Sequence, residues 1–317
     1  MQIDLEFFEA LRAEYLKDPV RLAAPFELRR LDGYGHRYYW RYCEDTDSVK
    51  FYPSVTSIIN ATMPTPDPLI EFYAEHGMKR AKQIAHEAAC YGTFLHAQCG
   101  IFAIHGLYDL DTIANTVSAW VFKNGIKFDT SDWVERVTRD LLAFAQFCKD
   151  YRVEVLAVEH VLCSDTLNMA GAIDFVLVMD DKKYDKTPVE KRNRITAIVD
   201  VKSPRKGSNY DEYAIQLNAY KRLWNEHFAG LGFEVTKVMN WNPKEWTSEP
   251  TYTITDHTES SVKDRIDLLL PIAAQVIPAK PKPKFYAAGV MKLGESVYNN
   301  FGINDITQHI FKHFRNG

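Results

Sequence analysis

Three β-type segments in the middle of the chain place charged side chains among apolar residues. The segments are 153–163, 170–179 and 195–202, and their charged residues are Glu159, Asp174, Asp200 and Lys202. Residues two apart on a strand share a face, so Asp200 and Lys202 point the same way, and Val199 and Val201 point into the core. Burying an unpaired charge is costly, so these side chains must pair with one another or hold a metal ion.

Two interpretations of these charges remain open. In the first, Asp200 and Lys202 form a structural ion pair, and Glu159 and Asp174 merely lie at strand ends. In the second, Asp174 and Asp200 converge near Lys202. Such an oxygen-rich site suits Mg²⁺ or Mn²⁺. The lysine would then orient an attacking water and offset charge that develops on a phosphate.

The segments around the three strands define a fold class. An amphipathic helix is expected over 134–150, a second helix over 210–228 and a further strand over 233–239, whereas the charged stretch 180–194 is typical of a hairpin loop. The resulting order is helix, three strands, helix, strand. It predicts an α/β core with a mixed sheet and a helix-rich N-terminal elaboration.

The flanking regions show weaker patterns. We expect a helix at 3–16, a β-hairpin at 26–42 turning at Asp32-Gly33, a helix capped by Ser54, and a proline-rich turn at 63–68. The pattern over 69–104 is helical, with interruptions near Gly77 and at 91–93. A further helix is expected over 260–277, followed by a basic extended segment at 278–284. No internal repeat is visible.

Five short motifs occur in the order found in one enzyme family. They are Tyr52 to Ile58 followed by Met63-Pro64, Gly92-x-x-x-His96, Gly171-x-x-Asp174, Asp200-x-Lys202 and Gln216-x-x-x-Tyr220. Over 51–224 the chain resembles the PD-(D/E)XK nuclease superfamily, and most of all its RecB-like exonuclease branch, including phage exonucleases and the mitochondrial genome maintenance exonuclease. The chain carries Asp200 where Glu is commoner, a change that the family tolerates.

The resemblance implies a restriction-endonuclease-like core and a role for each motif residue. Asp174, Asp200, the carbonyl of Val201 and His96 would be metal ligands for Mg²⁺ or Mn²⁺. Glu159 would help to bind or position the metal and its water, Lys202 would be the catalytic lysine, and Gln216 and Tyr220 would reach toward the phosphate or the lysine. The last cysteine, Cys163, precedes Asp174, so no iron–sulfur cluster is expected. The implied reaction is hydrolysis of DNA phosphodiester bonds to 5′-phosphate products.

Substrate contacts are expected at the rim of this site. Ser203, Arg205 and Lys206 follow the catalytic strand directly, and Thr93 belongs to the helical motif. The aromatic and basic hairpin residues at 29–42 would either stack unpaired bases or pack on the core. The basic segment at 280–284 would either track DNA or serve as a linker.

Composition places limits on class and location. The 317 residues carry 38 Lys and Arg against 42 Asp and Glu, a formal charge of −4, which excludes a histone-like coat but leaves room for a local basic groove. The five cysteines are scattered through the sequence, so we expect them to be reduced thiols. The first residues are acidic, whereas a signal peptide begins with basic residues. We expect a soluble cytoplasmic protein without a membrane span, in the bacterial host if phage-encoded. Its regions would be 1–133, 134–245 (the nuclease core) and 246–317, within one compact unit.

Three functions remain as hypotheses. The first is a metal-dependent exonuclease acting on single-stranded or end-containing DNA in phage or bacterial recombination or repair, with recombination or replication proteins as partners. The second is a structure-specific or restriction-type endonuclease with the same core, and the third a non-catalytic DNA-binding protein. Retention of Asp174, Asp200 and Lys202 argues against the third. No Walker-type loop is present, so helicase activity is not expected.

Overall fold

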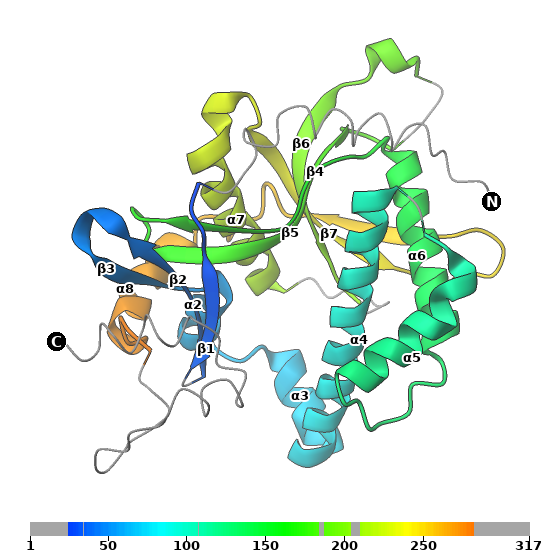
Figure 1. Ribbon diagram of the computed structural model, residues 1–317, viewed down its shortest axis with the longest axis horizontal. Helices are drawn as coiled ribbons and strands as arrows, with labels where there is room; N and C mark the ends of the chain where they lie inside the picture. The colour runs from blue at the N-terminus through cyan, green and yellow to red at the C-terminus, as the bar shows by residue number, and fades with distance from the viewer. Residues whose placement is uncertain (1–24, 34, 107, 184–186, 204–209, 282–317) are drawn as a thin grey trace.

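The computed structural model describes residues 25–33, 35–106, 108–183, 187–203 and 210–281 (Figure 1). The helix expected at 3–16 and the last part of the basic segment expected at 278–284, residues 282–284, lie outside these residues. Pro278, at the start of that segment, is packed against the fold, because its carbonyl accepts a hydrogen bond of 2.9 Å from the Tyr38 hydroxyl.

A small antiparallel sheet forms the N-terminal part of the described chain. Its strands are β1 (Arg29–Gly33), β2 (His36–Cys43) and β3 (Ser48–Pro53), in the order β1-β2-β3. The first two form the predicted hairpin, but its turn follows Gly33 instead of falling at Asp32-Gly33, since these two residues pair with Arg37 and His36. Strand β3 was not predicted. Helix α2 (Val55–Thr62) follows, with Ser54 as the predicted N-cap, since its Oγ accepts a hydrogen bond of 3.0 Å from the backbone N–H of Ser57.

The central sheet has five strands in sequence order. They are β4 (Glu154–Ser164), β5 (Met169–Asp180), β6 (Arg194–Val201), β7 (Val235–Pro243) and β8 (Tyr252–Asp256). Only β6 and β7 pair in parallel, and helix α7 (Asp211–Phe228) connects them. Together with α6 (Trp133–Asp150) ahead of β4, this gives the predicted order of helix, three strands, helix, strand. The prediction of a mixed α/β sheet is confirmed, and β8 is an addition to it.

The remaining helices correct several predicted boundaries. They are α3 (Asp67–His76), α4 (Met78–His105), α5 (Ile113–Lys123) and α8 (Ile266–Val276), with short 3₁₀ turns at Glu44–Thr46, Leu110–Thr112, Val189–Lys191 and Ala229–Leu231. The predicted break at Gly77 is present, but α4 runs without interruption through 91–93. Helix α3 begins within the expected proline-rich turn, because a proline is tolerated in a first helical turn. Helix α8 begins six residues later than predicted, at Ile266, after the turns over 258–265.

Helices cover both faces of the central sheet (Figure 1). On one face, side chains of α4 and α6 such as Phe94 and Phe144 share a core with Phe175 and Val199 of the strands. On the other face, α7, α2 and α8 pack on alternate strand residues; Ile215, Leu223, Ile198 and Val238 belong to this second core. The sheet is thus buried on both sides, which explains why its strands are apolar throughout.

The structure also bears on the expectations for cysteines and membranes. All five cysteines are free thiols, as predicted. Within the described part of the chain, no helix has the length and apolar character that crossing a bilayer requires.

Candidate active site

The acids predicted to converge lie abreast on neighbouring strands. Phe175 pairs with Val199 between β5 and β6, which brings the adjacent Asp174 and Asp200 to the same level of the sheet. On β4, the pairs on either side of Glu159 (Val158 with Phe175, and His160 with Ile173) place Glu159 at the level of Asp174. The three acids therefore form a row across β4, β5 and β6.

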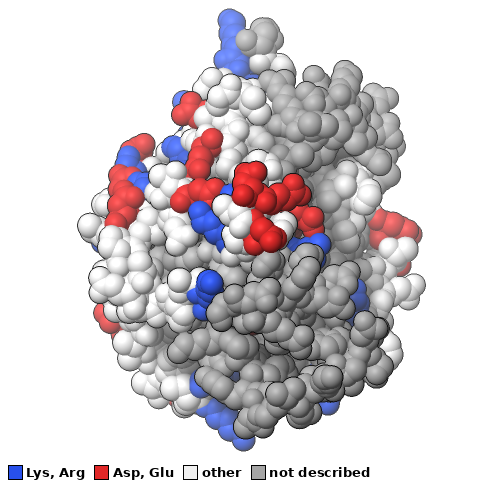
Figure 2. Space-filling model, turned by 60° about the vertical axis from the view of Figure 1, so that its left-hand side comes forward, with Lys and Arg blue, Asp and Glu red and all other residues white. Residues whose placement is uncertain are grey.

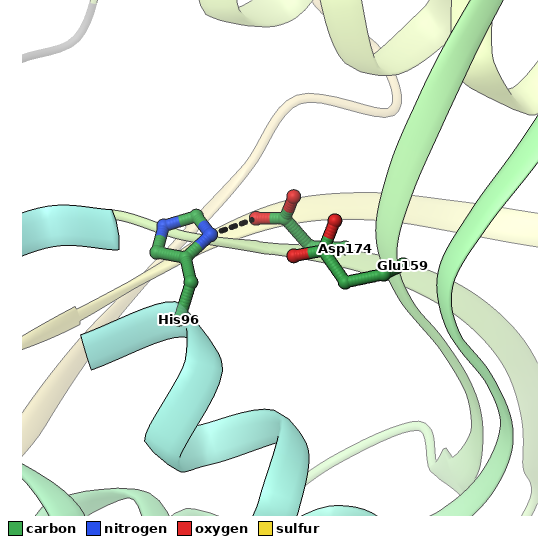
Figure 3. A group of neighbouring side chains, drawn as sticks. All are labelled: His96, Glu159 and Asp174. Carbon is green, nitrogen blue, oxygen red and sulfur yellow. Dashed lines mark ion pairs between the residues drawn. The ribbon is translucent and has the colours of Figure 1, made fainter. Parts of the chain in front are cut away.

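Helix α4 brings His96 to this row. Its Nδ1 lies 3.2 Å from Oδ2 of Asp174 (Figure 3). One ligand atom each from His96, Glu159 and Asp174 all lie within 4.8 Å of one another. Two oxygen–cation bonds of about 2.0–2.6 Å each span up to roughly 5 Å, so one cation can contact all three. One imidazole and two carboxylates suit a divalent cation such as Mn²⁺ or Mg²⁺.

Glu159 stands where β4 departs from regular strand geometry. Its φ is +49°, in the left-handed region, which costs a non-glycine residue about 1–3 kcal/mol. In a regular strand Val158 and His160 would share a face. Here Val158 lies next to Gly100 of α4, whereas the ring of His160 meets Trp224 of α7. The strand thus changes face at Glu159, a strained arrangement of the kind that functional sites retain.

Asp200 and Lys202 form the predicted pair beside the three-residue group. Lys202 Nζ lies 2.6 Å from Oδ2 of Asp200 and 4.6 Å from the centroid of the Tyr213 ring. Val201 between them is fully buried, as predicted, and its N–H donates a 3.1 Å hydrogen bond to Oδ2 of Asp174. The structural ion pair posed from the sequence is present. The predicted convergence is met only in part, because the three-residue group contains Asp174 and His96 but has Glu159 where Asp200 was expected.

The electrostatics of the site show an excess of negative charge. Burial raises the pKa of the Asp174 carboxyl well above its usual range, and the charges of Asp200 and Glu159 raise it further. The expectation that Glu159 is buried is wrong, because its side chain is exposed, but partial loss of hydration still raises its pKa, with His96 opposing the shift. The pKa of His96 is lowered, chiefly by burial, which favours the neutral imidazole that ligates metals. A cation bound among these groups would relieve the repulsion between the acids.

Lys202 remains a cation in this setting. Burial opposes its charge, but the charges of Asp200 and Asp174 outweigh burial, so the pKa of Lys202 is raised. A lysine of this kind donates hydrogen bonds and neutralises charge, and does not act as a general base at neutral pH.

Both motif glycines make room for neighbouring side chains. A Cβ added to Gly171 would overlap Cε1 of Tyr220, and a Cβ added to Gly92 would lie 3.2 Å from Oγ of Ser203. Gly92 therefore sits inside α4 because the chain after Lys202 passes close to it, and it does not break the helix.

Replacing Gly171 by alanine is expected to destabilise the protein by about 1–3 kcal/mol, because the buried Tyr220 ring must move to admit a methyl group. Urea unfolding measures this change. Gly230→Ala is the matched control, since a Cβ there meets no atom within 4 Å. Equal stability of the two variants would show that the Gly171 contact has no energetic weight.

The helix residues expected to reach over the site engage each other. Gln216 Nε2 donates a 3.1 Å hydrogen bond to the hydroxyl of the buried Tyr220. The described contacts of these two residues include none with Lys202, and the aromatic ring that does contact the lysine is that of Tyr213. Burial and the charges of Asp200 and Asp174 raise the pKa of Tyr220, so its hydroxyl lies near the acids of the site. The lysine is not its partner among the described contacts, and its reach toward a phosphate stays a prediction. Tyr213, one turn before Gln216 on α7, was missed because it lies outside the motif spacing.

A second residue missed by the sequence analysis is Asn240 on β7. It pairs with Asp200 across the parallel strands, and its Nδ2 donates a 2.7 Å hydrogen bond to Oδ2 of Asp200. Asn240 is a polar residue in an apolar strand, between Met239 and Trp241. The criterion that singled out the acids would have found it if applied to neutral side chains.

The predicted substrate contacts are only partly described. Ser203 is half-buried beside Gly92, and Thr93 is exposed on α4, where its Oγ1 donates a hydrogen bond to the carbonyl of Ala89. Arg205 and Lys206 lie outside the described residues.

Three aromatic residues of the hairpin belong to the core. Tyr38, Tyr39 and Trp40 are buried, so packing is the correct interpretation for these rings, whereas Tyr42 at the end of β2 is exposed. Figure 2 turns this side of the molecule forward and shows acidic and basic side chains interspersed on it, with acidic ones gathered near the centre. The described part of this face has no continuous basic surface.

Comparison with known proteins adds nothing to these observations. A scan against protein-family models finds no match, and a search of curated proteins finds none either. The function must therefore be argued from the site.

Proposed function

We propose that this chain is a Mg²⁺- or Mn²⁺-dependent nuclease of the PD-(D/E)XK type that hydrolyses DNA phosphodiester bonds from a free end. The proposal rests on one observation, the convergence of His96, Glu159 and Asp174 within 4.8 Å of one another beside the Asp200–Lys202 pair. A mixed sheet with helices on both faces supports the restriction-endonuclease-like core that the motifs imply.

Each side chain has a distinct task in this reaction. His96, Asp174 and Glu159 would hold the cation, with Asp200 and the backbone of Val201 beside them. When bound, the cation supplies the Lewis acidity that polarises a phosphate and makes an attacking water more acidic. Lys202, kept charged by Asp200 and Asp174, is available to orient that water and to offset negative charge on the phosphate.

Preference for DNA ends rests on the resemblance to RecB-like exonucleases. An exonuclease with this core would act on single-stranded or end-containing DNA during recombination or repair in a phage or bacterium, in the cytoplasm and alongside recombination or replication proteins. An endonuclease or an inactive DNA-binding protein with the same core would share most of the site, so the experiment must separate all three.

Incubation of the full-length protein with end-labelled linear and covalently closed circular single strands tests the proposal. We expect Mn²⁺ or Mg²⁺ to support degradation of the linear strand, EDTA to stop it, and the circle to survive. Labels at the two ends, followed separately on denaturing gels, give the polarity.

Each other outcome identifies a different function. Cleavage of the circle would indicate an endonuclease. Binding without cleavage in either metal would indicate a DNA-binding protein, and cleavage that persists in EDTA would contradict the metal site.

A further inference from the structure

A chain of buried polar side chains leads from Asp200 away from the proposed metal ligands. Asn240 Nδ2 donates to Oδ2 of Asp200 at 2.7 Å, and Asn240 Oδ1 lies 2.8 Å from Nε2 of His257. Asn218 on α7 donates a 3.0 Å hydrogen bond to the carbonyl of His257. All four residues are buried.

The hydrogen bonds of this chain have a defined direction. A carboxylate paired with Lys202 has only acceptors to offer, so the amide nitrogen of Asn240 must face Asp200. The amide oxygen of Asn240 then accepts, and Nε2 of His257 must carry the hydrogen. Because both the nitrogen and the oxygen of the Asn240 amide form hydrogen bonds, the amide cannot flip. Asn240 therefore holds the carboxylate of Asp200 in one orientation.

The two carboxylate oxygens of Asp200 therefore differ in their contacts. Lys202 and Asn240 both contact Oδ2. Among the described residues, no hydrogen bond or ion pair engages Oδ1. The orientation thus keeps Oδ1 of Asp200 available for another ligand, one strand away from Asp174 and beside, not within, the group of His96, Glu159 and Asp174.

We propose that Asn240 is a positioning residue, held by His257, that orients Asp200 so that Oδ1 can join His96, Glu159 and Asp174 in binding the divalent cation. This inference rests on the proposed function, and it assigns a role to two residues outside the nuclease motifs.

Packing alone does not explain why Asn240 and His257 are polar. A buried amide and imidazole lose their hydration and must be compensated by hydrogen bonds, whereas a leucine, which has the same branching and number of side-chain heavy atoms as asparagine, carries no such cost. Val238, two residues earlier on β7, is fully buried and apolar. The fold thus accepts an apolar side chain near this position, and the polar one serves Asp200.

Mn²⁺ binding tests the role directly, without relying on catalysis. Calorimetric titration of Mn²⁺ into the full-length protein is expected to show affinity about 10- to 100-fold weaker in Asn240→Leu, as for other residues that orient metal ligands. His257→Leu should weaken binding less, because Asn240 remains. His257→Gln, which can still donate to Asn240, should recover part of the loss.

The control variant perturbs a half-buried asparagine elsewhere on α7. Asn225 on α7 hydrogen-bonds the backbone of Val235 and contacts no residue of the proposed metal site. Asn225→Leu should lower the melting temperature and leave Mn²⁺ affinity unchanged. This comparison separates loss of stability from loss of orientation.

The outcomes separate this inference from the proposed function. Mn²⁺ affinity equal to wild type in a folded Asn240→Leu would overturn the positioning role while leaving the nuclease proposal intact. If that variant does not fold, equal affinity in the two His257 variants and wild type would overturn it instead. A wild-type protein that binds no Mn²⁺ would overturn both proposals.

Discussion

Replacing Lys202 by methionine is expected to slow DNA cleavage by about 100- to 1,000-fold, the scale on which loss of one preorganised donor acts. Methionine keeps the length of the side chain and removes the charge. The altered site can still bind a cation and the DNA backbone, so DNA affinity measured by fluorescence anisotropy in EDTA should change little. Single-turnover cleavage of a labelled linear strand in Mn²⁺ gives the rate.

Lys237→Met is the matched control for this variant. Lys237 lies near the start of β7, in the same sheet, and also pairs with a carboxylate, that of Asp181. It contacts none of the proposed metal ligands. We expect Lys237→Met to lose some stability and keep the wild-type cleavage rate, and wild-type cleavage by Lys202→Met would refute the assigned role of Lys202.

The central strands could be predicted because a sheet that is buried on both faces has strands with continuous runs of apolar residues. Elements that are stabilised mainly by tertiary packing have a weaker sequence pattern. Helix α5 contains β-branched and small polar residues with low helix propensity, and Ile113 and Val117 anchor it in the core. Strand β8 is short and only half-buried, so its alternation is faint.

The residues of the candidate site also differ in how easily the sequence reveals them. A carboxylate in an apolar strand is conspicuous because its burial needs compensation, and Asp174 and Asp200 were found for that reason. Glu159 was singled out on the same ground, but it is exposed at the position where β4 changes face. Asn240 and Tyr213 are ordinary residues in sequence, and only strand pairing and the packing of α7 bring them to Asp200 and Lys202. At Glu159 the backbone is left-handed and β4 changes face. Neither the glutamate itself nor the residues next to it in the sequence indicate this conformation.

Asp174→Asn is expected to abolish Mn²⁺-dependent cleavage and, in EDTA, to make the protein more stable. The substitution removes a buried charge that lies beside two other acids, Asp200 and Glu159. Each unit by which folding raises the pKa of a carboxyl corresponds to about 1.4 kcal/mol of stability lost when the group ionises. We therefore expect a gain of about 1 kcal/mol or more at pH 8, measured by urea unfolding in EDTA.

Asp180→Asn gives the opposite expectation on the same strand. Asp180 is also buried on β5, but Arg192 and Arg194 pair with its carboxylate at 3.2 and 3.3 Å. Removing its charge weakens the hydrogen bonds that both arginines donate to it, although Arg194 keeps its pair with Glu154, so this variant should lose about 1–3 kcal/mol. Equal effects of the two substitutions would show that Asp174 is compensated within the protein and needs no cation.

The pH dependence of the Asp174→Asn effect follows from the direction of the pKa shift. Folding raises the pKa of Asp174, so between the unfolded value of about 3.9 and the folded value the native state binds more protons than the unfolded chain. Stability contributed by this group is present below pH 4 and declines as pH rises through the folded pKa. The difference in unfolding free energy between variant and wild type should thus be small near pH 4 and grow toward pH 8. Saturating Mn²⁺ stabilises the wild type but not the variant, and should reduce or reverse the difference. A difference that stays constant with pH in EDTA would contradict the charge repulsion on which the metal site is argued.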